Sequence, residues 1–295
     1  MSKRRVLAVA ALLFAAFATY RVFGVYTVRS GECAPGDSIP MDHRFPKRGA
    51  GAEQARTLVV MSYNVEGHAA LLRKDHLRKI AAVIVAAKAD LVGLQEVHRG
   101  TWQSRFRDQA AELARLSGMT VYFGRSFDAL GGEFGNAILT RGTLIEAEVY
   151  ELPSVGEPRT LLRGTVEIGG HILNFYVTHL ATWGRFNRAS RTEQIECIAQ
   201  HIRRSPYPFV VVGDFNASPV TPEVSSFTTS NLVRLANANT GGTHRLTGQH
   251  LDYIFSDPGW DVKSARVLAE GPSDHWPLLA ELDWIASARQ RAEAR

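Results

Sequence analysis

The sequence predicts an α/β fold in which packed β-sheets are covered by helices. From Thr57 onward, short runs of branched and aromatic residues alternate with segments whose apolar residues recur every three or four positions. Gly169-Gly170 joins two of these runs as a hairpin turn would, and direct hairpins do not occur in a purely parallel, doubly wound sheet. The chain has 295 residues, which is enough for one large domain with its own core.

Eight segments have the composition of strands and three have the period of amphipathic helices. The predicted strands are Leu58–Tyr63, Leu91–Gln95, Ala137–Thr140, Leu161–Ile168, Ile172–His179, Phe209–Gly213, Leu251–Phe255 and Leu278–Leu282. The predicted helices carry apolar stripes at Leu77, Ile80, Ala81, Ile84 and Ala87, at Phe106, Ala110 and Leu113, and at Ile195, Ile198, Ala199 and Ile202.

The first 28 residues have the pattern of a signal peptide or a membrane anchor. A Lys-Arg-Arg cluster precedes the uncharged apolar run Val6–Tyr20, and Ala16-Phe17-Ala18 is a candidate cleavage site. The run is shorter than the ~20 residues of a spanning helix, so cleavage and anchoring both stay open. Residues 29–56 are predicted as a linker, 57–285 as the folded domain and 286–295 as a basic tail.

The formal net charge of +5 comes from the leader, because residues 1–30 hold five basic side chains and no acid. The rest of the chain carries equal numbers of basic and acidic residues, which argues against strong nonspecific binding to nucleic acid. A hydrophobic content of 45% excludes a disordered chain. The two cysteines, Cys33 and Cys197, define neither a disulfide framework nor a metal site.

Polar residues that can bind a metal or move a proton follow several of the predicted strands. Each has a simpler interpretation: Asn64 and Asn216 can end a strand in a turn, and Glu96 can be a solvated strand end. Groups at strand ends can, however, converge on one rim of a rigid scaffold. The segments concerned are Tyr63-Asn64, Gln95-Glu96, Thr178-His179, Gly213-Asp214-Phe215-Asn216, Leu251-Asp252 and Ser273-Asp274-His275.

These segments resemble, in the same order along the chain, motifs of the endonuclease/exonuclease/phosphatase superfamily. The resemblance covers residues 57–284 and implies a four-layer, DNase-I-like sandwich of two packed mixed β-sheets flanked by helices. It also implies a hydrolase that cleaves phosphoester bonds with a divalent metal. The motifs are Met61-Ser62-Tyr63-Asn64-Val65, Leu94-Gln95-Glu96-Val97, Gly135-Asn136-Ala137-Ile138-Leu139, Thr178-His179-Leu180, Gly213-Asp214-Phe215-Asn216, Leu251-Asp252-Tyr253-Ile254-Phe255 and Ser273-Asp274-His275.

The resemblance implies a role for each matching residue. It implies that Glu96 is the main metal ligand and that Asn64 and Asp274 assist it. Their oxygen atoms suit Mg²⁺, with Mn²⁺ as an alternative. The predicted catalytic residues are Asp214, Asn216, His179, His275, Asp252 and Asn136.

Asp214 is expected to activate the attacking water, with Asn216 holding it or a phosphate oxygen in register. His275 is expected to meet the phosphoryl group, with Asp252 fixing its tautomer. His179 is expected to act on the leaving group. Asn136 would contact a phosphate oxygen or orient a neighbour.

Two features bear on the substrate. Arg185, Arg188 and Arg191 either bind substrate phosphates or an anionic membrane, or simply decorate the start of a helix. Residues 241–244 depart from a short Thr-aromatic-Pro motif of many relatives, which leaves the substrate contacts open.

The expected function is Mg²⁺-dependent hydrolysis of phosphodiester or phosphomonoester bonds by in-line attack of water. The substrate would be a lipid headgroup, a small phosphodiester or a nucleic acid. One alternative is an extracytoplasmic endonuclease acting on DNA or RNA, and another is a noncatalytic, membrane-tethered binding module of the same fold. The leader predicts a secreted, periplasmic or membrane-anchored protein without an obligate protein partner.

Overall fold

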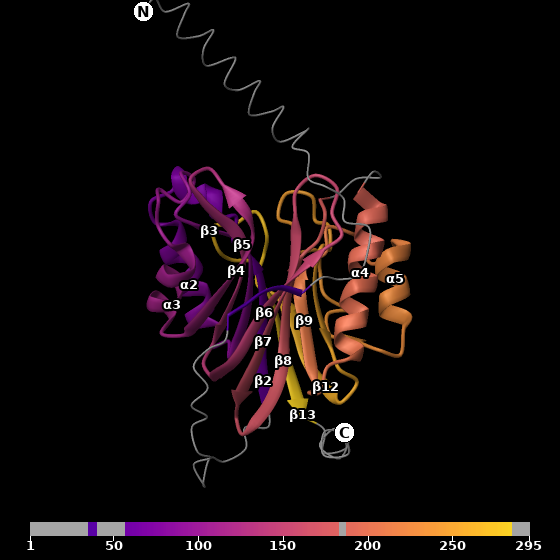
Figure 1. Ribbon diagram of the computed structural model, residues 1–295. Helices are drawn as coiled ribbons and strands as arrows, with labels where there is room; N and C mark the ends of the chain where they lie inside the picture. Colours follow the sequence, from indigo (N-terminus) through magenta and orange to yellow (C-terminus); the bar gives the residue numbers. More distant parts are fainter. Residues whose placement is uncertain (1–34, 40–56, 183–186, 285–295) are drawn as a thin grey trace, which may run out of the picture.

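Two mixed β-sheets pack face to face in the computed structural model, which describes residues 35–39, 57–182 and 187–284 (Figure 1). One sheet has the strand order β12 (Trp260–Val267), β13 (Leu278–Trp284), β2 (Thr57–Asn64), β3 (Leu91–Arg99), β5 (Gly132–Thr140) and β4 (Thr120–Ala129). The other has the order β1 (Pro35–Ile39), β6 (Thr143–Leu152), β7 (Arg159–Ile168), β8 (His171–His179), β9 (Phe209–Asp214), β11 (Asp252–Ser256) and β10 (Arg234–Leu235).

Helices cover the outer face of each sheet. α2 (His76–Ala86) and α3 (Gln109–Ser117) lie on the six-stranded sheet, and α4 (Arg188–Arg203) and α5 (Pro222–Thr229) on the seven-stranded sheet (Figure 1). A short 3₁₀ helix, η1 (Gly67–Leu71), follows β2. The predicted four-layer α/β sandwich is therefore confirmed.

Three apolar clusters fill the three interfaces between the layers. The central cluster joins side chains of both sheets, such as Val60 and Ile138 from one and Phe175 and Val212 from the other. The second cluster packs α2 and α3 on the six-stranded sheet, and the third packs α4 and α5 on the seven-stranded sheet. Burial on both faces explains why the central strands are continuous apolar runs in the sequence.

The pairing of the strands gathers their polar ends at one edge of the sandwich. β2 runs parallel to β3, and β8 runs parallel to β9, so the carboxyl ends of each pair lie together. β11 is antiparallel to β9, and its first residue therefore lies opposite the last residue of β9. Gly93 lets the sheets approach here, because a Cβ at this position would lie 2.3 Å from Cγ2 of Val212.

All eight predicted strands form, but five others were not predicted. Four of these, β1, β4, β10 and β12, are the edges of the two sheets. An edge strand is covered less completely and carries more polar residues, so its sequence lacks the apolar run that marks a central strand. The fifth, β6, alternates apolar and acidic residues. β1 belongs to the segment predicted as a linker and pairs with β6.

The hairpin at Gly169-Gly170 is confirmed: both residues have positive φ angles and Ile168 pairs with His171. α3 begins at Gln109, not at the expected Phe106, because the side chain of Asp108 accepts a hydrogen bond from the Ala111 amide and caps the helix. Phe106 is left exposed in the preceding loop.

The predicted leader, residues 1–28, and the predicted tail, residues 286–295, lie outside the described residues. Within the described part of the chain, no helix has both the length and the apolar content needed to cross a bilayer. Cys197, on α4, is disulfide-bonded, and the other cysteine of the sequence is Cys33, outside the described residues. Two cysteines far apart in the sequence give no spacing pattern from which the bonded state of Cys197 could be predicted.

Candidate active site

Three of the predicted residues lie in a row across neighbouring strands. Asp214 ends β9, His179 ends β8 as its parallel register partner, and Asp252 begins β11 as its antiparallel register partner. All three are buried. The arrangement explains why residues 73 positions apart in the sequence meet: each lies at the end of a strand that pairs with β9 or belongs to it.

The carboxylate of Asp214 is held by several donors. Its Oδ1 accepts a hydrogen bond of 2.8 Å from the Asn216 amide, and its Oδ2 accepts one of 3.2 Å from Nδ2 of Asn64. Two imidazole nitrogens face the same Oδ2, Nε2 of His179 at 3.6 Å and Nε2 of His275 at 3.7 Å. The carboxylate is thus fixed in orientation at the centre of the site.

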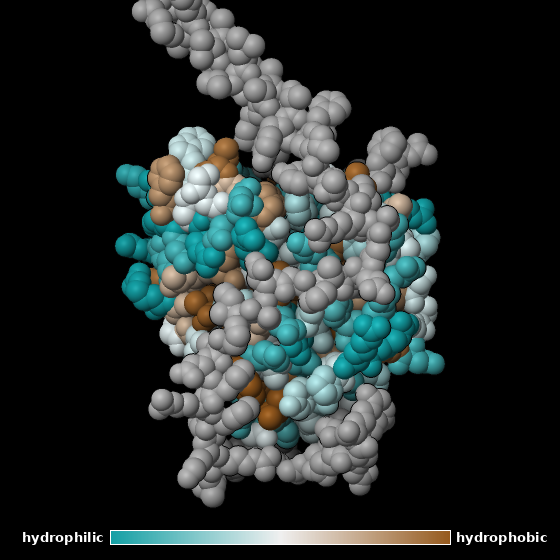
Figure 2. All heavy atoms as spheres, in the orientation of Figure 1, coloured by the Kyte–Doolittle hydropathy of each residue, from teal (hydrophilic) through white to brown (hydrophobic). Residues whose placement is uncertain are grey.

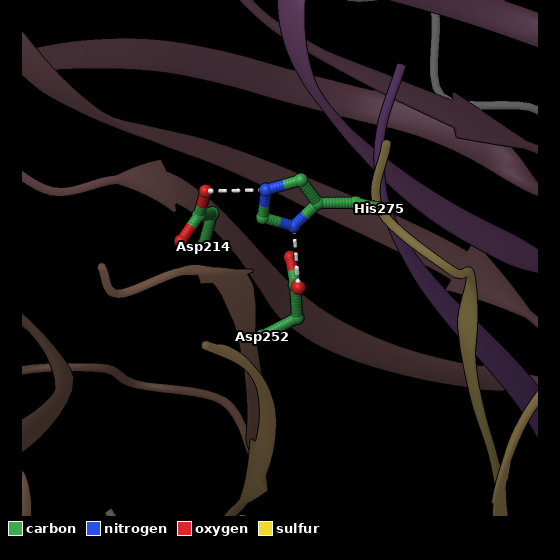
Figure 3. A group of neighbouring side chains, drawn as sticks. All are labelled: Asp214, Asp252 and His275. Atoms are coloured by element: carbon green, nitrogen blue, oxygen red, sulfur yellow. Dashed lines mark hydrogen bonds and ion pairs between the residues drawn. The ribbon is translucent and has the colours of Figure 1, made fainter. Parts of the chain in front are cut away.

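His275 lies between two carboxylates (Figure 3). Its Nδ1 is 2.8 Å from Oδ2 of Asp252, while its Nε2 points to Asp214. Burial alone would lower the pKa of His275, but the charges of Asp252 and Asp214 and the hydrogen bond to Asp252 raise it to about 10. The ring is therefore an imidazolium at neutral pH.

The pKa values of Asp214 and His179 are both shifted, in opposite directions. Burial, helped by the negative charge of Asp252, raises the pKa of Asp214 to about 7. Burial and the positive charge of Arg159 hold the pKa of His179 well below its ordinary value, so this ring is neutral. A neutral imidazole can still donate one hydrogen bond.

Glu96 reaches the site through an irregularity in β3. The register between β3 and β5 shifts between Leu94 and Val97, and Glu96 has a φ angle of 59°. A bulge of this kind redirects a side chain. Burial opposes ionisation of Glu96, but the nearby His68 and the hydrogen bond from Asn64 outweigh it and keep its pKa well below the ordinary value. The Asn64 amide is 3.0 Å from Oε1 of Glu96.

Two further groups, which the sequence analysis did not identify, surround Glu96. Nδ1 of His68 is 3.8 Å from Glu96, and Nε2 of His68 is 3.8 Å from Glu66. Oε2 of Glu66 accepts a hydrogen bond of 3.2 Å from the Asp274 amide. Burial and the negative charge of Asp274 raise the pKa of Glu66. Glu66 lies two residues after Asn64, and this closeness to a predicted metal ligand was the sequence feature that could have identified it.

Two groups of side chains could hold a cation. Asp214, Asp252 and His275 offer ligand atoms within 4.8 Å of one another, but both ring nitrogens of His275 already face the two carboxylates. The carboxylates of Glu66, Glu96 and Asp274 form the second group. Burial and the negative charge of Asp274 raise the pKa of Glu66, and His68 lies between Glu66 and Glu96. Carboxylate oxygens are the hard ligands that Mg²⁺ prefers. Within the described part of the chain, only the first group brings three ligand atoms so close together, whereas the second consists of carboxylates alone.

The two predicted asparagines take different positions. Asn216 lines the cleft and has a φ angle of 50°, and its side chain donates to the carbonyl of Leu180. Asn136 lies beneath the site, where its Nδ2 is 3.4 Å from the carbonyl of Thr160. Its contact is with the backbone beside Arg159. This position agrees with orienting a neighbour, the second of the two predicted roles.

The site opens into a cleft with a volume of about 510 Å³. Arg159, missed by the sequence analysis, lines it and is 3% exposed. One guanidinium nitrogen pairs with Glu157 at 3.1 Å, whereas Nε and Nη1 are buried without a hydrogen-bond partner. Unpaired buried N–H groups are costly, so this guanidinium is suited to an anionic ligand. Phe127 and Phe134 form an apolar wall of the cleft.

The arginines that follow β8 do not contribute to the cleft lining where they are described. Arg188 and Arg191 pair with Glu223 on α5, at 3.3 and 3.0 Å, and join two helices. This agrees with the simpler of the two interpretations. Arg185 lies outside the described residues.

The divergent segment 241–244 supports the site directly. Oγ1 of Thr243 accepts hydrogen bonds of 3.1 Å from the amides of Leu251 and Asp252. His244 packs edge-on against His275 with their ring centres 5.0 Å apart. In this segment Thr243 helps to position Asp252, and His244 contributes to the lining of the cleft.

Comparisons with known proteins agree with this geometry. Curated protein sequences give no significant match. Among solved structures, an endonuclease/exonuclease/phosphatase from Beutenbergia cavernae is 25% identical with a TM-score of 0.67, over 78% of this chain and 72% of that one. A mannosyl-6-phosphatase from Bacteroides thetaiotaomicron is 22% identical with a TM-score of 0.64, over 77% of this chain and all of its own.

The human Nocturnin catalytic domain with a bound sulfate anion is 23% identical with a TM-score of 0.64, over 78% of this chain and 96% of that one. At these identities the last two show a shared fold. The model of the endonuclease/exonuclease/phosphatase family matches residues 61–275, from β2 to His275. Its members are generally hydrolases of phosphoester bonds that depend on a divalent metal. This chain, which has their fold and carries the polar strand ends of the motif at one cleft, belongs to that family.

Proposed function

We propose that the protein is an extracytoplasmic, Mg²⁺-dependent hydrolase of phosphodiester or phosphomonoester bonds. The observation that carries this proposal is the environment of Asp214. Its buried carboxylate faces two imidazoles at 3.6 and 3.7 Å and is linked through the side-chain amide of Asn64 to the carboxylate of Glu96. A base, hydrogen-bond donors and a metal-binding group at one cleft are the parts that attack of water on a phosphate requires.

Each residue then has a defined task. Asp214 takes a proton from the attacking water, and the imidazolium of His275 donates a hydrogen bond to a phosphoryl oxygen. Neutral His179 donates a hydrogen bond to the leaving oxygen, which takes its proton from solvent water, and the unpaired N–H groups of Arg159 bind the phosphate charge. Mg²⁺ at Glu96, Glu66 and Asp274 would neutralise developing negative charge. Asn64 links the proposed metal ligand to the proposed base, since its side-chain amide donates hydrogen bonds to Glu96 and to Asp214.

The experiment that tests this function is a substrate panel with and without EDTA. It includes p-nitrophenyl phosphate, bis-p-nitrophenyl phosphate, DNA, RNA, sphingomyelin and inositol phosphates. We expect hydrolysis of at least one member, its loss with EDTA and its return with added Mg²⁺. Hydrolysis confined to DNA or RNA would identify the endonuclease alternative. Absence of hydrolysis across the panel would favour the noncatalytic binding module.

The pH dependence of kcat/KM is expected to be bell-shaped. The rate rises through about pH 7, because Asp214 must lose its proton to act as a base. It falls through about pH 10, because His275 must keep its proton. Asp252→Asn removes the main charge that raises the His275 pKa, so the falling limb should move to lower pH. Measurement at saturating Mg²⁺ checks this, and an unchanged falling limb would contradict the role given to Asp252.

Arg159→Gln is expected to lower kcat/KM by about 10- to 100-fold, the worth of one or two hydrogen bonds to a charged group. Folding should be preserved, because the change removes a buried charge with two unpaired N–H groups. Arg163→Gln is the matched control, since Arg163 lies on the same strand but pairs with Glu146 and Glu148. Equal kinetics in both variants would exclude phosphate binding by Arg159.

The bonded state of Cys197 supports a location outside the cytoplasm. Structural disulfides persist in oxidising compartments and are rare in the cytosol, and the apolar leader run has the pattern of an export signal. Alkylation of the unfolded, unreduced protein recovered from its natural compartment should label neither cysteine. Labelling of both without a reductant would count against export.

A further inference from the structure

A group of exposed apolar side chains lies beside the mouth of the cleft. Trp102 and Phe106, in the loop before α3, are 55% and 68% exposed, and Leu130, at the β4–β5 turn, is 47% exposed. The two loops touch, since the Trp102 amide donates to the carbonyl of Leu130 at 3.2 Å. Arg105 of the same loop donates to the carbonyl of Leu71, which brings the exposed Leu72 alongside. We call Leu72, Trp102, Phe106 and Leu130 the rim patch.

The rim patch is continuous with the cleft. Leu130 itself and Gln103, the neighbour of Trp102, line the cleft. Other loops at the mouth add further exposed apolar side chains next to lining residues. These are Val155 before Glu157, Leu246 before Thr247 and Val220 after Asn216.

The opposite end of the strands is different. Among the described residues, the remaining large apolar side chains that are exposed are Val85, near the end of α2, and Tyr207, before β9. Both precede strands that run toward the cleft, so both lie at the far end of the sandwich. Single exposed apolar residues are ordinary, but a group around one opening marks a contact surface.

Basic side chains accompany the apolar ones. Arg73 and Lys74 follow Leu72, Arg105 precedes Phe106, and Arg245 precedes Leu246, all exposed. The exposed acids nearby are engaged, Asp75 with Lys79, Asp128 with Arg125 and Asp108 as the cap of α3. In Figure 2, apolar and hydrophilic side chains meet at the surface of the upper end of the molecule, where β4 and β5 turn in Figure 1.

Aromatic and aliphatic side chains flanked by arginine and lysine match the interface of a bilayer with anionic headgroups. We propose that the rim patch docks on an anionic lipid surface and presents the cleft to phosphoesters at that surface. This inference rests on the proposed function for the nature of the substrate. Arg73 also pairs with Glu66 at 3.5 Å, and Arg245 stacks on Trp276. All four basic side chains remain exposed, and a purely apolar protein surface would offer them no negative charge, so the bilayer is the better match.

Quenching of tryptophan fluorescence tests the docking without turnover. The full chain is mixed with vesicles of phosphatidylcholine and phosphatidylglycerol whose acyl chains carry bromine, which quenches an indole on contact. We expect quenching that Trp102→Phe largely removes and that Trp260→Phe, a change in the buried core, leaves intact. The leader holds no tryptophan, so its own insertion gives no signal.

A second measurement separates docking from catalysis. Leu72→Ser and Phe106→Ser together should lower hydrolysis of a vesicle-embedded diester by about tenfold or more while leaving a soluble diester unaffected. The double variant Val85→Ser, Tyr207→Ser is the matched control, and it should change neither the hydrolysis of the vesicle-embedded diester nor that of the soluble diester. Equal quenching in wild type and Trp102→Phe, or no bromolipid quenching at all, would overturn the proposal and favour a protein partner. Failure of hydrolysis with intact quenching would overturn only the proposed function.

Discussion

Asp214→Asn is expected to lower kcat by about a thousandfold or more, because general-base catalysis contributes about 10²- to 10⁴-fold and the carboxylate also orients both imidazoles. Asparagine has the same shape and can still accept a hydrogen bond from the Asn216 amide. It cannot take a proton from water. The measurement is turnover of the best substrate of the panel at saturating Mg²⁺.

The fold of this variant should survive. His275 keeps its 2.8 Å contact with Asp252, and replacing a buried carboxylate of raised pKa by a neutral amide removes an unfavourable charge. We therefore expect an unfolding temperature equal to or above that of the wild type. Asp261→Asn, in an exposed pair with Arg234, is the control. Turnover within a few fold of wild type would remove Asp214 from the mechanism.

The central part of the site could be predicted from the sequence because it depends on regular structure. His179, Asp214 and Asp252 each follow or begin an apolar run, and parallel or antiparallel pairing of those runs brings the three together at one edge. The central strands were predicted because they, too, are continuous apolar runs in the sequence. The edge strands β4 and β12 were not, because their side chains are half exposed and lack the apolar run.

The rest of the site depends on features that have no sequence period. Glu96 points into the cleft because of a bulge and a left-handed backbone at its own position. His68 matters only because η1 places it between two carboxylates. Arg159 is distinguished by buried N–H groups without partners, a property that exists only in the packed structure. The roles of such residues can be recognised only in the folded structure, because their chemistry comes from the groups that surround them.

Glu96→Gln is the second large expected effect. It removes a carboxylate whose pKa is held well below its ordinary value, and with it a full negative charge toward a divalent cation. Because a metal contributes several kcal/mol of charge stabilisation, turnover should fall by about two to four orders of magnitude. Glutamine keeps the length of the side chain, so the bulge in β3 and the contact with Asn64 should persist.

The same variant decides between the two groups that could hold the metal. If Mg²⁺ binds at Glu66, Glu96 and Asp274, titration calorimetry should show its affinity reduced at least tenfold in Glu96→Gln, the scale expected for loss of a charged ligand. Glu281→Gln, in a surface pair with Arg266, should bind Mg²⁺ as the wild type does. If Glu96→Gln kept its affinity while Asp252→Asn lost it, the metal would belong to Asp214, Asp252 and His275, and the role of His275 as a hydrogen-bond donor to the phosphoryl group would have to be abandoned.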